Sequence, residues 1–171
     1  MRLSIIGLPG SGKTHLAQAI GIKLKVPHIH LDRFWFEAGG LFKYTHGSEE
    51  EKEQVRAYVR EQALRAIAEE AWVSDGFYSH LQPEIAERVD AIIFLDISLR
   101  QRLLNHAIRM FNFEARHKEL RFWHDVRFFS EIIKSTFERG PKLKDFVSQY
   151  KHKVVILESR AEIEKYLRNL S

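Results

Sequence analysis

The segment from Gly7 to Thr14 reads Gly-Leu-Pro-Gly-Ser-Gly-Lys-Thr and fits the phosphate-binding pattern G-x-x-x-x-G-K-[ST]. Glycines let a backbone fold around anionic oxygens, and the amides that open a helix attract phosphate. We therefore expect a nucleoside triphosphate to be held by Gly7, Pro9, Gly10, Ser11 and Gly12. Lys13 is expected to reach the β- and γ-phosphates, and the Thr14 hydroxyl to bind Mg²⁺. The alternative, a turn that binds nothing, is disfavoured because all four fixed positions and the flanking strand and helix agree.

Aspartates follow three of the expected strands, at Asp32, Asp75 and Asp96. Ligands of open parallel sheets bind at the carboxyl ends of the strands, so these carboxylates are candidates for metal and proton chemistry. Asp32 is the first candidate, as a Mg²⁺ ligand with Thr14 or as the group that accepts a proton from the acceptor; its alternative is a cap or a partner for Arg33. Asp75 is either a second metal partner or a turn former. For Asp96 the structural role is favoured.

A basic block runs from Arg100 to Arg127 and contains seven basic residues against three acidic ones. Arginine can hold phosphate oxygens with two parallel hydrogen bonds, so we expect at least one arginine here to bind phosphate. Our candidates are Arg109, on the polar side of a helix, and Arg116, in the irregular segment after it, which could close over a nucleotide. The alternatives are a solvated pair of helices and a nucleic-acid surface.

The aromatic stretch around Trp35 has two interpretations, stacking on a planar acceptor or packing beneath a long loop, and packing is the commoner fate of aromatic residues. Five histidines are considered as metal ligands: His30, His46, His80, His106 and His124. They do not show H-x-x-x-H spacing, so no histidine metal site is expected.

The elements that must position these residues follow from hydrophobic periodicity and capping signals. Strands are expected near residues 2–6, 28–31, 71–74, 91–95 and 154–157. Helices are expected near residues 13–25, 48–70, 83–88, 98–111, 120–139, 143–150 and 159–170. Residues 33–47 and 113–118 are expected to be irregular. This alternation predicts an α/β fold, a parallel sheet with helices on both faces.

Length and composition are ordinary for a globular protein. The 171 residues are 44% hydrophobic and 29% charged, carry a net charge of +4 and include no cysteine. We expect a single domain over residues 1–171, as a monomer or homodimer, with no disulfide and no thiol chemistry. No apolar run is long enough to span a bilayer and no signal peptide is evident, so a cytoplasmic location without membrane contact is expected.

Four segments together resemble the P-loop kinases of the adenylate kinase and shikimate kinase type, and more narrowly the DNA topology modulation proteins. They cover residues 5–14, 30–35, 72–79 and 93–96. The resemblance implies a three-layer α/β/α P-loop NTPase fold, with a five-stranded parallel sheet in the order 2-3-1-4-5. It also implies an acceptor-binding insertion at about 33–70 and a lid, as in adenylate kinase, at about 112–121.

The resemblance also assigns roles to single residues. It places Asp32 near Mg²⁺ and the acceptor, Arg109 among the arginines that grip phosphates, and the loop containing Arg160 near adenine. Asn105, a candidate nucleotide-binding residue, stands where related kinases often carry an arginine that packs on adenine. The acceptor side would be lined by Asp32, Arg33, Trp35, Asp75, Gly76 and Tyr78.

These observations predict an ATP- and Mg²⁺-dependent phosphotransferase that phosphorylates a small acceptor such as a nucleoside, a nucleotide or another small metabolite. The catalytic residues would be Lys13, Asp32, Arg109 and Arg116. One alternative is a nucleotide-dependent regulator linked to DNA topology, whose basic block contacts DNA or a protein, although direct nucleic-acid binding is not expected. A second alternative is an ATP-binding module without turnover, against which the intact Lys13-Thr14 pair and Asp32 argue.

Overall fold

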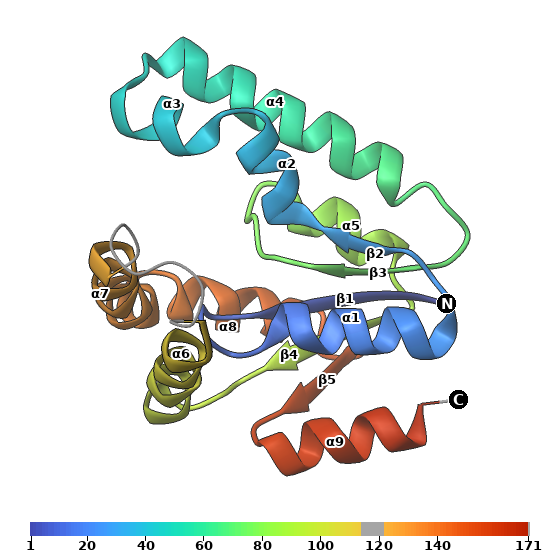
Figure 1. Ribbon diagram of the computed structural model, residues 1–171. Helices are drawn as coiled ribbons and strands as arrows, with labels where there is room; N and C mark the ends of the chain where they lie inside the picture. The colour runs from blue at the N-terminus through green and yellow to red at the C-terminus, as the bar shows by residue number, and fades with distance from the viewer. Residues whose placement is uncertain (114–121, 171) are drawn as a thin grey trace. The chain divides into compact units, whose positions relative to one another are not determined.

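Five parallel strands form one sheet in the order β2-β3-β1-β4-β5, with helices on both sides (Figure 1). The computed structural model describes residues 1–113 and 122–170, without the side chains of residues 41, 44, 45, 109–113 and 122–127. The strands are β1 (Arg2–Gly7), β2 (His28–His30), β3 (Trp72–Asp75), β4 (Ala91–Leu95) and β5 (Val154–Leu157). This sheet order confirms the expected fold class.

The chain divides into two compact units. Unit 1 comprises Met1–Ile5 and Thr14–Ile92, and unit 2 comprises Ile6–Lys13 and Ile93–Ser171. Among the described residues, no helix is both long and apolar enough to cross a membrane.

Unit 1 contains strands β2 and β3. Its helices are α1 (Lys13–Leu24, from Thr14 onward), α2 (Leu31–Glu37), α3 (Gly40–His46), α4 (Glu49–Ala66) and α5 (Gln82–Arg88). Trp72 on β3 is fully buried and donates its indole N–H to the Ile67 carbonyl at 3.1 Å. Parallel pairing places His30 opposite Asp75 and Ile29 opposite Ser74, so the strand ends meet at one edge.

The expectation of an irregular segment over residues 33–47 was wrong, because the structure forms α2 and α3 there. Both helices pack against α4 (Figure 1). Leu31 at the start of α2 is fully buried. Gly39 joins the two helices with a left-handed φ of 70°, a conformation that glycine adopts without strain. Tertiary packing therefore outweighs the weak helical signal of this aromatic-rich sequence.

Unit 2 contains the phosphate-binding loop and the C-terminal helices. These helices are α6 (Leu99–Phe113), α7 (Phe122–Glu138), α8 (Gly140–Gln149) and α9 (Arg160–Asn169). Helix α7 packs on both α6 and α8. The sequence predicts a helix from about Leu143, but α8 begins earlier, at Gly140. Pro141 stands in its first turn, a position that proline tolerates well.

Candidate functional site

The loop from Gly7 to Lys13 has the backbone of a phosphate-binding turn. The Ser11 amide donates to the Leu8 carbonyl at 3.2 Å and closes the turn. Gly10 and Gly12 have left-handed φ values of 82° and 92°, which side chains with a Cβ rarely adopt. At Gly10 a Cβ would also lie 2.9 Å from the Arg102 carbonyl oxygen, so both conformation and space require glycine.

The same loop leaves room and donors for a phosphate. A Cβ on Gly12 would meet no described atom within 4 Å. The Ser11 hydroxyl is buried and has no hydrogen-bond partner among the described residues. The Lys13 ammonium donates a hydrogen bond to the Leu8 carbonyl, with Nζ 3.1 Å from the oxygen. These features fit a bound polyphosphate.

Arg102 on α6 donates a hydrogen bond to this loop. It was not predicted as a site residue. Its side chain is buried, with 1% exposure, and every hydrogen bond that we resolve for it goes to a neutral oxygen. Its Nη1 reaches the Pro9 carbonyl at 3.3 Å, its Nε the Ile97 carbonyl at 3.1 Å, and its Nη2 the Thr136 hydroxyl at 2.7 Å. Burial lowers the pKa of Arg102, and the nearby Asp96 carboxylate partly offsets this. The guanidinium thus ties the loop to α7.

Asn105 lies one helical turn beyond Arg102. Its Nδ2 donates to the Gly10 carbonyl at 3.0 Å, and its Oδ1 accepts from Gln101 Nε2 at 2.9 Å. Sequence analysis assigned Asn105 to nucleotide binding. In the structure its side chain supports the backbone of the phosphate-binding loop, and its contact with a nucleotide remains a prediction.

In unit 1, four side chains meet at the end of β3. The Thr14 hydroxyl donates to Asp75 Oδ2 at 2.5 Å. The other carboxylate oxygen, Asp75 Oδ1, lies 2.7 Å from His28 Nε2 and 2.9 Å from His30 Nδ1. Asp75 itself is only 1% exposed. The structure therefore joins the threonine of the P-loop motif to Asp75.

Asp75 stays ionised in this setting. Burial opposes its ionisation, but the hydrogen bonds from Thr14, His28 and His30 together outweigh burial and lower the pKa of the Asp75 carboxyl. A hydroxyl and a carboxylate supply the oxygen ligands that Mg²⁺ prefers, so Thr14 and Asp75 fit a magnesium ion.

Asp32, the residue predicted to share Mg²⁺ with Thr14, has a different partner. Its Oδ1 accepts the Tyr78 hydroxyl at 2.8 Å, which joins the start of α2 to the segment after β3. Both residues are half-buried and both belong to the predicted acceptor side. The structure thus brings two predicted acceptor residues together, while the metal role of Asp32 remains a prediction.

The other predicted acceptor residues make local contacts in unit 1, and their acceptor roles stay predictions. Arg33 is exposed and pairs with Glu37 one turn later, its Nε 2.7 Å from Oε1. The indole of Trp35 covers Gly40, where a Cβ would lie 2.4 Å from a ring atom. Gly76 has a φ of 123°, and a Cβ there would press on Leu31.

The predicted phosphate-binding arginines are only partly described. Arg116 lies outside the described residues, and the backbone of Arg109 belongs to α6 while its side chain is outside the described set. Arg160, predicted near adenine, is highly exposed and pairs with Glu164, its Nε 2.9 Å from Oε1. The roles of all three stay predictions.

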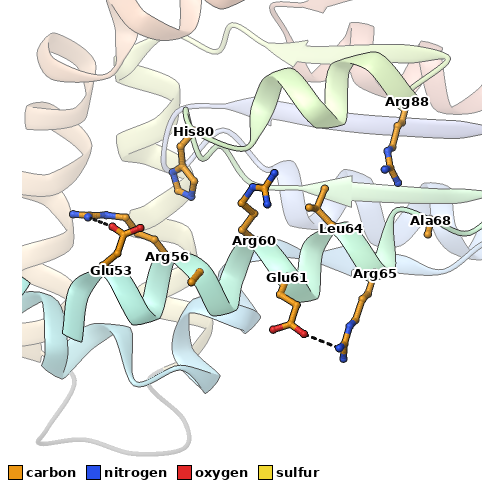
Figure 2. A pocket seen from close by; sticks show the side chains of 10 residues that line it. Glu53, Arg56, Arg60, Glu61, Leu64, Arg65, Ala68, His80 and Arg88 are labelled. Atoms are coloured by element: carbon orange, nitrogen blue, oxygen red, sulfur yellow. Dashed lines mark hydrogen bonds and ion pairs between the residues drawn. The ribbon is translucent and has the colours of Figure 1, made fainter. Parts of the chain in front are cut away.

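A surface groove of about 700 Å³ lies between α4 and α5 in unit 1. Figure 2 shows His80 and Arg88 on one side and the residues of α4 on the other, with Arg56 paired to Glu53 and Arg65 to Glu61. The predicted acceptor residues Asp32 and Tyr78 do not line this groove. We therefore do not assign the acceptor to it.

Comparisons with known proteins support the fold. No family model matches the chain, and no curated protein matches it in sequence. A solved shikimate kinase from Bacteroides thetaiotaomicron is similar to it, with a TM-score of 0.61 and 23% identity over 98% of this chain and 94% of that chain. A shikimate kinase from Acinetobacter baumannii in complex with shikimate has a TM-score of 0.57 and 13% identity, covering 98% of this chain and 89% of that chain. At these identities the likeness shows that the chain shares the fold of these two shikimate kinases.

Proposed function

We propose that this protein is a Mg²⁺- and ATP-dependent phosphotransferase that moves the γ-phosphoryl group of ATP to a hydroxyl of a small acceptor. The observation that carries the proposal is the hydrogen bond from Thr14 to the buried Asp75 carboxylate. Thr14 directly follows Lys13 at the end of a glycine loop with left-handed backbone at Gly10 and Gly12. Loop, lysine, hydroxyl and carboxylate are the parts that P-loop enzymes use to hold the triphosphate and its metal.

The residues of the proposed active site have the following roles. The loop amides and Lys13 bind the β- and γ-phosphate oxygens, while Thr14 and Asp75 hold Mg²⁺. Mg²⁺, when bound, neutralises charge on the transferring phosphoryl group. Asp32 orients the acceptor hydroxyl and takes its proton, and Tyr78 fixes the Asp32 carboxylate. Arg109, on α6, and Arg116, in a proposed lid at about residues 112–121, are proposed to bind the phosphates.

The acceptor is proposed to bind in an insertion at about residues 33–70 of a single kinase domain. The fold is shared with shikimate kinases, one of which was solved in complex with shikimate. Polyhydroxy acids are therefore candidate acceptors to be tested together with nucleosides and nucleotides.

The proposal is tested by incubating the full chain with ATP, Mg²⁺ and a panel of nucleosides, nucleotides and polyhydroxy acids. ADP release and the phosphorylated acceptor are both measured. We expect one acceptor class to give product and Lys13→Ala to lower its turnover about 100-fold or more, because the developing phosphoryl charge loses its cation. Lys23→Ala, on the same helix, is the matched control. Undiminished turnover in Lys13→Ala, or no product with any acceptor, would contradict the proposal.

A further inference from the structure

Two histidines on β2 approach one oxygen of a buried carboxylate on β3. Within the described residues, His28, His30 and Asp75 offer ligand atoms that all lie within 4.8 Å of one another. We propose that His28 Nε2, His30 Nδ1 and Asp75 Oδ1 bind a transition-metal ion of the Zn²⁺, Co²⁺ and Ni²⁺ class. This site uses the carboxylate oxygen that Thr14 does not contact, and it does not depend on the proposed kinase activity.

The strand geometry fixes these three side chains. His28 and His30 are two residues apart on one strand, so their side chains point to the same face of the sheet. The parallel register places His30 directly beside Asp75 on the neighbouring strand. All three therefore project from hydrogen-bonded backbone, which positions metal ligands more accurately than a loop does.

The distances suit a metal. Bonds of about 2.0–2.2 Å from nitrogen and oxygen ligands to a divalent ion place neighbouring ligand atoms about 3 Å apart. The two imidazole nitrogens lie 2.7 Å and 2.9 Å from Asp75 Oδ1. An ion can therefore replace these hydrogen bonds with small rotations of the imidazole rings.

The ligand chemistry selects the class of ion. Imidazole nitrogens favour Zn²⁺, Co²⁺ and Ni²⁺, whereas Mg²⁺ favours oxygen ligands and keeps its water. The side chains of His28 and His30 are 19% and 34% exposed, which gives an ion and its remaining waters access from solvent. Asp75 is 1% exposed and supplies a carboxylate held in place by Thr14.

The test is a Co²⁺ titration of the full chain, followed by the visible absorption of bound Co²⁺ and by calorimetry. We expect one ion per chain. His28→Gln and His30→Gln should each lower the affinity at least ~10-fold, because even the loss of a residue that only supports a ligand costs that much. His152→Gln, at an exposed histidine outside the site, is the control and should bind as the unmodified chain does.

Two further measurements keep the result decisive. Circular dichroism of each variant without metal verifies the fold. In the unmodified chain, Zn²⁺ should protect His28 and His30, but not His152, from acylation by diethylpyrocarbonate, read by peptide mass. Equal Co²⁺ affinity in all three variants, or uniform acylation, would overturn the proposal and leave His28 and His30 as hydrogen-bond donors to Asp75.

Discussion

At the scale of single residues, a substitution at Asp32, which accepts the Tyr78 hydroxyl, tests acceptor chemistry independently of nucleotide binding. We expect Asp32→Asn to lower kcat about 100-fold or more, because an amide cannot take the proton of the acceptor hydroxyl. The affinity for ATP, measured by calorimetry, should stay nearly unchanged, because the hydrogen bond described for Asp32 goes to Tyr78 on the predicted acceptor side. Steady-state kinetics with the acceptor found in the screen provide the other measurement.

Tyr78→Phe is the matched variant. It removes the hydroxyl that donates to Asp32 Oδ1 at 2.8 Å but keeps the ring. Losing a positioning hydrogen bond should cost about tenfold in kcat, less than losing the carboxylate. If Asp32→Asn turns over at the unmodified rate, Asp32 has a structural role only.

The sequence identified some of these residues better than others. The P-loop motif fixed Lys13 and Thr14 because its spacing is specific. Asp75 was expected either as a metal partner or in a turn, and only the structure shows that its carboxylate accepts the Thr14 hydroxyl. His28 was missed because histidine spacing was examined for a helix; on a strand, the spacing His-x-His places both rings on one face.

At the scale of elements, Arg102 connects α6 to the phosphate-binding loop and to α7. We expect Arg102→Lys to lower the free energy of unfolding by about 3 kcal/mol, because one ammonium cannot serve the Pro9, Ile97 and Thr136 oxygens together. Affinity for ATP should fall as well, because the Pro9 carbonyl loses its donor. Urea unfolding and calorimetry measure the two effects.

Arg100→Lys is the control for this prediction, since Arg100 is exposed on the same helix. Its change should stay within about 0.5 kcal/mol, as for most surface substitutions. Equal stability of Arg102→Lys and Arg100→Lys would show that the buried guanidinium contributes little.

Helix α4 begins with a complete capping box. The Ser48 hydroxyl accepts the Glu51 amide at 3.2 Å, and the Glu51 carboxylate accepts the Ser48 amide at 2.8 Å. We expect Ser48→Ala to lower the free energy of unfolding by about 1 kcal/mol, because the Glu51 amide then loses its acceptor. The measurement is urea unfolding, with Ser148→Ala, at an exposed position inside α8, as comparison. A loss in Ser148→Ala as large as in Ser48→Ala would rule out the capping box as the cause.

The elements were predictable where periodicity and caps agreed. Periodicity and capping signals predicted a helix from about residue 48, where α4 forms, and a strand at residues 91–95, where β4 forms. Residues 33–47 failed because α2 and α3 are short and depend on packing against α4, which no local pattern records. The sheet order came from the family resemblance, since periodicity alone does not order strands.

At the scale of the whole molecule, charge decides between a kinase and a nucleic-acid-binding regulator. The net charge is only +4. In the described part of the basic block, Arg102 is buried beneath the phosphate-binding loop and is not available to a DNA phosphate. Beyond the block, Arg139 pairs with Glu131 and Arg160 with Glu164. Among the described residues, Arg102, Arg139 and Arg160 are therefore each engaged within the protein.

We accordingly expect duplex DNA to bind no more tightly than about 10⁻⁵ M at physiological salt, within the range of non-specific contacts. Fluorescence anisotropy with a labelled duplex, repeated at several salt concentrations, gives both the affinity and its salt slope. The same preparation should form ADP and phosphorylated acceptor. Tight DNA binding with a steep salt slope and no turnover would favour the regulator, because that slope counts the phosphates neutralised by the protein. Weak DNA binding together with product formation would assign the phosphate-binding loop to phosphoryl transfer.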